Sequence, residues 1–204
     1  VIQNQQTSKY TLGIKLFVLG SKVQSAINLV ETVTPFLQKL SQNTNESINF
    51  AILEGREAVC LSKIESSEVL RTDIKIGERL PSHCTAIGKA LLAFLPERKF
   101  TMLYGKDNKK LHTFTPNSIY SVMELKKYLK KVKKDGYAID KEEFKIGINC
   151  LGVPIINNEG KSIAGISITG PSSRFNLSEM KKLKNTLISI SKDISNQLNR
   201  VNML

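Results

Sequence analysis

The stretch INCLGVPIINNEGKSIAGISIT, residues 148–169, decides the fold because it holds two apolar segments on either side of a polar turn. Residues 157–160, Asn-Asn-Glu-Gly, are typical of a hairpin turn, so the two segments are predicted to pair as antiparallel strands. In the second strand Ser167 and Thr169 point to one side, while the neighbouring isoleucines point to the other. Hydroxyl groups that face a buried side need hydrogen-bond partners, which a ligand or ordered water could supply.

Two further regions complete the predicted sheet. Between residues 48 and 61 apolar and polar residues alternate around a turn at residues 54–57. A third strand is predicted to begin at Ile74 and Ile76, and residues 137–140 form another strand before the hairpin. The chain is therefore expected to contribute three strands on each side of its central helices.

Helical periodicity marks the segments around these strands. Apolar residues recur at helical spacing over residues 21–40, where Pro35 is expected to kink or restart the helix because it lacks an N–H group. Shorter helices are predicted from Thr85 and over residues 97–104, and a long final helix begins at a cap formed by Asn176. This order, without alternating βαβ units, predicts an α+β domain with one antiparallel sheet and helices on both faces.

The positive charge of the chain is concentrated in one segment. The chain has 30 Lys and Arg against 18 Asp and Glu, a net charge of +12, and six lysines fall within residues 126–134. Valine and leucine interleave with them at helical spacing. The segment is therefore interpreted as an amphipathic helix that ends at Gly136, with the lysines on its solvent-exposed face. Non-specific nucleic-acid binding through this helix is the alternative. The lysines are Lys126, Lys127, Lys130, Lys131, Lys133 and Lys134.

Composition excludes several classes of protein. No apolar run approaches the roughly 18 residues of a membrane helix, and the N-terminal residues do not resemble a secretory signal. The three cysteines form no CxxC pair, and no four-ligand zinc spacing is present. An odd number of isolated cysteines indicates a reducing compartment, so a cytoplasmic location is expected.

Residues 83–89, HCTAIGK, contain parts of two catalytic motifs and complete neither. A phosphate-binding Walker loop needs a hydroxyl residue after its lysine, but Ala90 follows Lys89. His83 beside Cys84 suggests a thiol nucleophile, yet adjacent residues rarely face each other well enough for proton transfer. Cys84 is interpreted as a packing residue, with a Cys84-dependent enzyme as the alternative. No catalytic residue and no cofactor are expected.

The helix start after Thr85 offers a different chemistry. The backbone N–H groups of a first helical turn have no partner within the helix and can bind a carboxylate. Gly88 is expected to permit close packing, and Lys89 is expected to face solvent.

Acidic residues give a further candidate site. Asp140, Glu142 and Glu143 could act as paired acids in acid–base chemistry, but the two glutamates are interpreted as solvated or capping residues. A metal site built from Asp140, Cys150, His83 and Cys84 is disfavoured, and no metal is expected.

The chain resembles the IclR family of bacterial transcription regulators. Several dispersed motifs agree in collinear order over essentially the whole chain. The resembling stretches are GERLPSHCTAIGKALLA at residues 77–93, residues 140–143, residues 150–154, residues 166–171 with Arg174, and residues 10–20.

The resemblance implies a GAF-like domain with an antiparallel sheet of about six strands, preceded by a linker helix. It divides the chain into the end of a winged helix with the linker start (1–20), the linker helix (21–44) and an effector-binding domain (45–204). It implies a small organic acid, a keto or sugar acid, as the effector. It also implies operator DNA as a partner through an N-terminal winged helix that this chain largely lacks, assembly as a homodimer or tetramer, and no membrane association.

The resemblance also implies which residues bind the effector. Backbone N–H groups at Ala86 and Ile87 are expected to hold its carboxylate. Cys84 stands where the family often has alanine, and Thr169 stands where it often has serine, so the preferred ligand is expected to differ from that of other members. Residues 70–73 are expected to form a strand wall. The other implied lining residues are Asp140, Cys150, Ser167 and Thr169.

Overall fold

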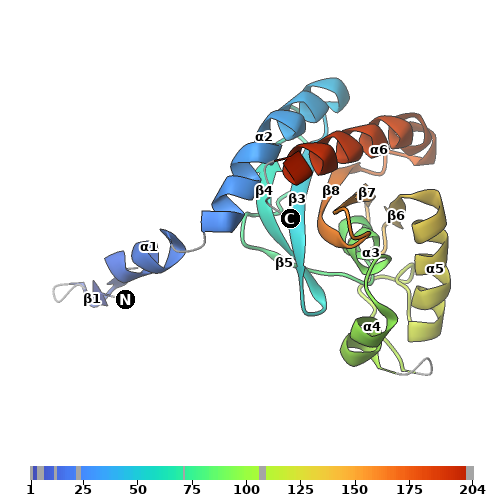
Figure 1. The fold of residues 1–204 in the computed structure, drawn as a ribbon, viewed down its shortest axis with the longest axis horizontal. Helices are drawn as coiled ribbons and strands as arrows, with labels where there is room; N and C mark the ends of the chain where they lie inside the picture. Colours follow the sequence, from blue (N-terminus) through green and yellow to red (C-terminus); the bar gives the residue numbers. More distant parts are fainter. Residues whose placement is uncertain are drawn as a thin grey trace.

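A six-stranded antiparallel sheet forms the centre of the molecule (Figure 1). The computed structural model describes residues 2–3, 7–11, 13–21, 24–70, 72–105 and 109–200. The strand order β5-β4-β3-β8-β7-β6, with helices on both faces, confirms the predicted α+β architecture. The strands are β3 (Ser47–Glu54), β4 (Glu57–Ile64), β5 (Arg79–Pro81), β6 (Ala138–Lys141), β7 (Ile148–Ile156) and β8 (Ser162–Pro171).

The hairpin of β7 and β8 forms as predicted. Its register runs from Ile148 opposite Pro171 to Ile156 opposite Ser162, and the side chain of Asn157 accepts a hydrogen bond from the backbone of Lys161 at 3.0 Å. β8 also pairs with β3, so the hairpin joins the two halves of the sheet. The hydroxyl-bearing strand therefore lies in the middle of the sheet, where its polar side chains are buried.

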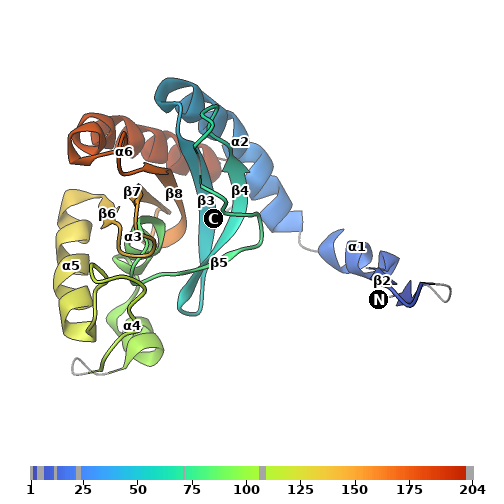
Figure 2. The same cartoon turned by 180° about the vertical axis from the view of Figure 1, so that it is seen from behind.

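Helices α2 (Gln24–Thr44) and α6 (Leu177–Arg200) cover one face of the sheet (Figures 1 and 2). Asn176 caps α6 by accepting hydrogen bonds from two backbone N–H groups of its first turn, as predicted. Of the two outcomes expected at Pro35, a kink or a restart of the helix, the restart is wrong, because α2 continues through this residue to Thr44. Val33 and Leu37, on either side of Pro35, are buried in the same apolar cluster, which holds both parts of the helix against the sheet.

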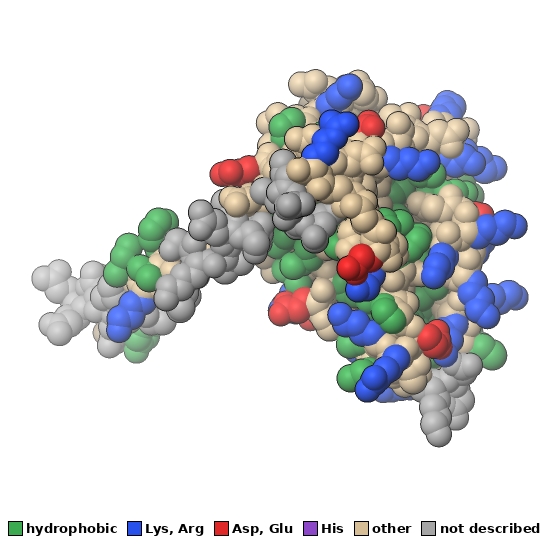
Figure 3. Space-filling view, viewed as in Figure 1, with side chains coloured by type: hydrophobic (Ala, Val, Ile, Leu, Met, Phe, Trp, Pro, Cys, Tyr) green, Lys and Arg blue, Asp and Glu red, His purple; other side chains and the backbone are tan. Residues whose placement is uncertain are grey.

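The opposite face carries α3 (Ala86–Leu92), α4 (Glu97–Tyr104) and α5 (Val122–Asp135). α5 begins at Ser121, whose hydroxyl accepts a hydrogen bond from the backbone of Glu124, and ends at Gly136 in a left-handed conformation. Its leucine and valine side chains are buried, whereas most of its lysines are exposed. Lysines lie over α5 at the right of Figure 3, which confirms the amphipathic interpretation of this helix.

The predicted third strand is displaced along the sequence. Residues 72–78 form no strand, and β5 is a short strand that begins at Arg79. The reason is a turn in which Gly77 adopts a φ of 84° and the carboxylate of Glu78 accepts a hydrogen bond from the backbone of Lys75 at 2.8 Å. The apolar residues at positions 74 and 76 therefore belong to a loop.

The N-terminal elements project away from the sheet in Figures 1 and 2. They are the two-stranded pair β1 (Ile2–Gln3) and β2 (Tyr10–Thr11), and helix α1 (Ile14–Ser21). Val23, part of the predicted apolar stripe, lies outside the described residues. Within the part of the chain that the structure describes, no helix is long and apolar enough to cross a membrane.

At Gly88 of α3 the fold leaves no room for a side chain. A Cβ atom there would lie 2.3 Å from the Cα atom and 2.6 Å from the carbonyl oxygen of Ser82. We expect Gly88→Ala to lower the free energy of unfolding by about 1–3 kcal/mol, because backbone atoms must move to admit the methyl group. Urea denaturation measures this change. Gly20→Ala is the control, since nothing lies within 4 Å of its Cβ position, and equal losses for both variants would contradict this packing.

Candidate functional site

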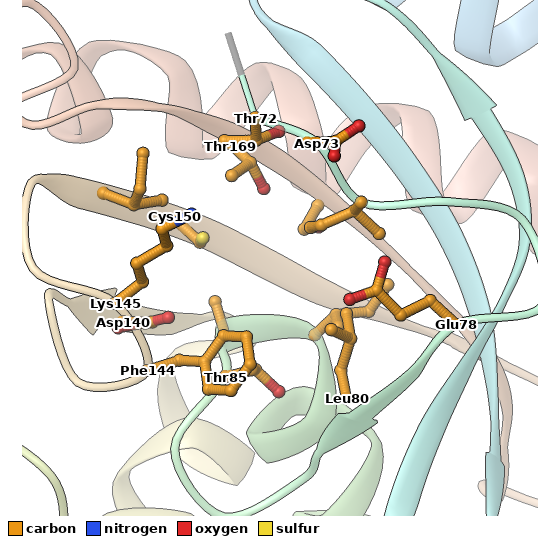
Figure 4. Close-up of a pocket in the computed structure, with 15 residues that line it drawn as sticks. Thr72, Asp73, Glu78, Leu80, Thr85, Asp140, Phe144, Lys145, Cys150 and Thr169 are labelled. Atoms are coloured by element: carbon orange, nitrogen blue, oxygen red, sulfur yellow. The ribbon is translucent and has the colours of Figure 1, made fainter. Parts of the chain in front are cut away.

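A cavity of about 350 Å³, here called the α3 pocket, lies where the start of α3 meets strands β6–β8 and the loop before β5 (Figure 4). Its size lies within the range of small-molecule sites. Figure 4 shows Asp140 and Cys150 on one side of the cavity and Glu78 on the other. The structure brings all six sequence-predicted site residues together around this one cavity. They are Ala86, Ile87, Asp140, Cys150, Ser167 and Thr169.

Close backbone contact fixes the start of α3 at the pocket. The hydroxyl of Thr85 donates a hydrogen bond to the carbonyl of Pro81 at 2.8 Å, which holds the turn before the helix. On β7, Gly152 packs directly on the helix, since a Cβ atom there would lie 2.6 Å from the carbonyl carbon of Ala86. The first turn of α3 is therefore held at the pocket wall, with backbone N–H groups that have no acceptor within the helix.

The hydroxyl pair on β8 has a protein partner that the sequence analysis missed. Asn49 of β3 donates from Nδ2 to Thr169 Oγ1 at 3.1 Å and to Ser167 Oγ at 3.5 Å. Asn49 lies opposite Ser167 in the register and is only 1% exposed. The signal was its place between Ile48 and Phe50, which puts an amide on the polar face of a strand.

Asp140 is a buried acid on the pocket wall. It is 2% exposed, pairs in register with Cys150, and accepts a hydrogen bond from the backbone N–H of Glu143 at 2.7 Å. Burial raises the pKa of Asp140 to about 6, although the nearby ammonium of Lys89 acts in the opposite direction. This carboxyl group therefore titrates close to neutral pH.

Lys89 does not face solvent, and Glu143 is not solvated, so both expectations are wrong. Lys89 is fully buried, its ammonium forms an ion pair with a carboxylate oxygen of Glu143, and it lies 4.6 Å from the ring centroid of Tyr128. All seven residues of α3 are buried, so this helix has no solvent face for a lysine to occupy. Burial raises the pKa of Glu143 to about 7, and the charge of Lys89 offsets part of this change.

The geometry does not support a thiol nucleophile at Cys84. Cys84 is fully buried, and burial raises the pKa of its thiol far above the ordinary value. The neighbouring His83 uses Nε2 for a 2.8 Å contact with the backbone carbonyl of His112, and burial lowers the pKa of His83. Among the described residues, no group of three or more His, Cys, Asp or Glu side chains could hold a metal ion.

The wall expected at residues 70–73 is a loop rather than a strand. Thr72 and Asp73 line the pocket, while Arg71 lies outside the described residues. The Thr72 hydroxyl is buried and has no hydrogen-bond partner among the described residues. Lys145 lines the pocket from the loop after β6.

Comparison with known proteins gives one consistent result. Residues 21–196 match the family model described as the C-terminal domain of the bacterial transcriptional regulator IclR. The HTH-type transcriptional regulator XynR of Escherichia coli strain K12 is 36% identical over 185 residues, which cover 91% of this chain and 73% of XynR.

Solved structures show the same fold. The crystal structure of the Thermotoga maritima IclR aligns with a TM-score of 0.83 at 31% identity, over 97% of this chain and 79% of that one. An IclR homologue from Microbacterium hydrocarbonoxydans, in complex with 4-hydroxybenzoate, aligns with a TM-score of 0.81 at 21% identity, over 97% of this chain and 79% of that one.

We expect native cysteines to resist alkylation by iodoacetamide near neutral pH. All three are buried, and burial raises the pKa of Cys60 to about 11 and those of Cys84 and Cys150 well above the ordinary value. Mass spectrometry counts the adducts. The chain unfolded in urea is the control and should react at all three positions. A native Cys84 that reacts as fast as free cysteine would contradict the packing role given to it.

Proposed function

Since the chain belongs to the IclR family of bacterial transcriptional regulators and contains that family's effector-binding domain, we propose that it senses a small organic acid in the α3 pocket. Members of this family bind operator DNA and small-molecule effectors, and its relatives are regulators rather than enzymes. The acid is a keto acid or a sugar acid. The observation that carries this proposal is the convergence of six dispersed residues on one cavity of about 350 Å³.

The two ends of the pocket bind different parts of the effector. The effector carboxylate accepts hydrogen bonds from the backbone N–H groups of Ala86 and Ile87, while Ser167 and Thr169 contact its other polar atoms. Leu80 of β5 lines the same cavity and contacts the apolar part of the effector. The homologue solved with 4-hydroxybenzoate supports an acid as the class of ligand, since that molecule carries a carboxyl group.

We divide the chain into three functional parts. Residues 1–20 are the end of a winged helix and the start of the linker, residues 21–44 are the linker helix, and residues 45–204 are the effector-binding domain. The observed bounds of α2 support the second boundary. Operator DNA is bound through an N-terminal winged helix, and the protein acts as a homodimer or tetramer. Exposed apolar side chains on α1, Ile14 and Phe17, support association between copies.

A set of contacts connects the pocket to the linker helix. The loop between β4 and β5, residues 65–70 and 72–78 of the described chain, lines part of the pocket and is here called the pocket loop. It is held at the short α2–β3 junction, because Ser66 donates from its hydroxyl to the carbonyl of Asn45 at 2.6 Å. Arg174 strengthens this connection with two hydrogen bonds to the carboxylate of Glu46 and one to the carbonyl of Leu70 at 2.8 Å. A ligand that orders the loop therefore also biases the position of α2.

Signalling then follows as a population shift. The effector binds one arrangement of the linker helices more tightly than another, and this difference in affinity sets the change in DNA binding. A tenfold change in operator affinity needs only about 1.4 kcal/mol of coupling. The hydrogen bonds of Ser66 and Arg174 are the proposed route of this coupling.

We expect at least one acid to raise the melting temperature when pyruvate, gluconate and 4-hydroxybenzoate are tested. A ligand at 100 times its Kd stabilises the folded state by about 2.7 kcal/mol. Ser167→Ala and Thr169→Ala should abolish the shift, because the hydroxyl groups of both side chains line the pocket. Differential scanning fluorimetry measures it.

Asn149→Ala is the matched control for these variants. Asn149 is also buried and donates to the carbonyl of Phe175 at 2.8 Å, but it is not among the residues that line the α3 pocket. This variant should lose stability and keep its ligand-induced shift. Absence of a shift with every acid, or wild-type shifts in the pocket variants, would contradict the site.

We expect Arg174→Gln to separate ligand binding from the response of the linker. In the wild-type chain an acid that binds should slow amide hydrogen exchange at the α2–β3 junction, residues 44–47. In the variant this protection should be lost while the Kd changes less than threefold, since Arg174 does not line the pocket. Arg79→Gln is the control, because Arg79 also forms ion pairs with glutamate, at Glu54 and Glu57, but lies on the exposed edge of the sheet. Unchanged protection in Arg174→Gln would contradict this route.

A further inference from the structure

A cluster of three buried charged groups lies at the back of the α3 pocket. Lys89 comes from α3, Asp140 from β6 and Glu143 from the following loop, and all three are buried. The ammonium of Lys89 pairs with Glu143, whose backbone N–H donates to Asp140 at 2.7 Å. The cluster therefore holds one cation and two carboxyl groups, so it carries a net charge of −1 when all three are ionised.

The surroundings of this cluster do not neutralise the excess negative charge. Of the described residues that line the pocket, Lys145 alone is basic, and it is exposed, whereas Asp73 and Glu78 add two further carboxylates. The thiols stay neutral, because burial raises the pKa of each. The titratable or charged groups around the cluster are His83 and Cys84 before α3, Tyr128 of α5, Lys145 of the loop after β6 and Cys150 of β7.

A carboxylate ligand meets an electrostatic obstacle in this cavity. An anion that enters a cavity of about 350 Å³ lies close to Asp140, which lines it. Like charges at short range in a poorly solvated site repel strongly. Protonation of one carboxylate removes this repulsion at the lowest cost in free energy. The oxygen Oε2 of Glu143 is buried and has no hydrogen-bond partner among the described residues, so a proton can bind there without breaking an existing hydrogen bond.

We infer that Lys89, Glu143 and Asp140 act as one proton-sharing unit that determines the charge selectivity of the pocket, so that an effector carboxylate binds together with one proton from solvent. This inference rests on the proposed function, because it concerns the same pocket and the same class of ligand. Asp140 and Glu143 share the proton. Lys89 is a positioning residue, and its ammonium balances the charge of one carboxylate when the other carboxyl group is protonated.

The titration behaviour of the free chain agrees with this geometry. Burial raises the pKa of Asp140 to about 6 and that of Glu143 to about 7. At neutral pH the pair is therefore close to its own titration. A bound carboxylate raises these pKa values further, so the bound state holds more protons than the free state and binding takes up a proton.

The sign of the pH dependence follows. Below about pH 6 the cluster already holds its extra proton, and the affinity for a carboxylate is independent of pH. Above about pH 6 the Kd for the carboxylate ligand increases, by up to about tenfold per pH unit when one proton is taken up. The ligand itself adds little to this trend, because ordinary carboxylic acids, with pKa values of about 3.5 to 4.5, are mostly ionised from about pH 5.5 upward.

Isothermal titration calorimetry measures this proton directly. The probes are pyruvate, gluconate and 4-hydroxybenzoate, titrated near pH 7 in phosphate and in Tris, whose ionisation enthalpies differ. We expect the observed enthalpies to differ by an amount equal to the uptake of about half to one proton. Identical enthalpies in both buffers, together with a flat Kd from about pH 5.5 to about pH 8, would overturn the inference.

Variants of Glu143 and Lys89 test which groups share the proton. Glu143→Gln keeps the shape of the side chain and leaves one cation against one carboxylate. We expect it to bind the acid with proton uptake near zero and a flat pH profile. Lys89→Met should move the profile to higher pH, and Lys89→Arg, which retains the charge, should restore the wild-type profile. A Glu143→Gln variant with undiminished proton uptake would overturn the role of this pair.

The free chain separates failure of this inference from failure of the proposed function. If no acid binds at any pH, the proposed function fails, and the cluster is judged by the unfolding of the free chain. A raised pKa for Glu143 predicts that wild-type stability, relative to Glu143→Gln, falls as pH rises from about 4.5 to about 7. A flat difference over this range would overturn the inference, and a decline would support the proton-sharing cluster.

Discussion

The close contact between α3 and its neighbours is the constraint on which the rest of the site depends. At Gly152 the sheet touches the backbone of Ala86, and at Gly88 the helix touches the turn that contains Ser82. Neither approach leaves room for a Cβ atom. Because the first turn of α3 cannot move away from the sheet, its backbone N–H groups, the hydroxyl groups of β8 and the carboxyl group of β6 enclose one cavity.

Burial of α3 has an electrostatic consequence. A helix that is covered on every side has no place for an exposed lysine, so the ammonium of Lys89 must find its counter-charge inside the protein. Glu143 provides it, and the ring of Tyr128 contacts the same ammonium. Such a buried ion pair is not needed for stability, since apolar residues of similar volume are often as stable. Its position behind Asp140 instead gives it a role in the electrostatics of the pocket.

Elements that follow from local sequence patterns were predicted correctly, whereas a strand whose position depends on a neighbouring loop was not. Strand β8, the cap of α6 at Asn176 and the end of α5 at Gly136 follow from local patterns, and the structure contains all three. Ile74 was placed in a strand because it is apolar, but the turn at Gly77 removes it from the sheet. A β-strand pattern does not record hydrogen bonds to a neighbouring loop, so periodicity alone could not locate β5.

The sequence by itself determined the α+β architecture, because periods of 2 and 3.6 residues are local properties of the chain. It also determined which residue types gather at the pocket, through motifs that match a known family. Only the tertiary structure decided that Asn49 bonds the hydroxyl groups of β8 and that Lys89 is buried against Glu143. These contacts join residues 54 or more positions apart, and their energies depend on burial, which no short stretch of sequence contains.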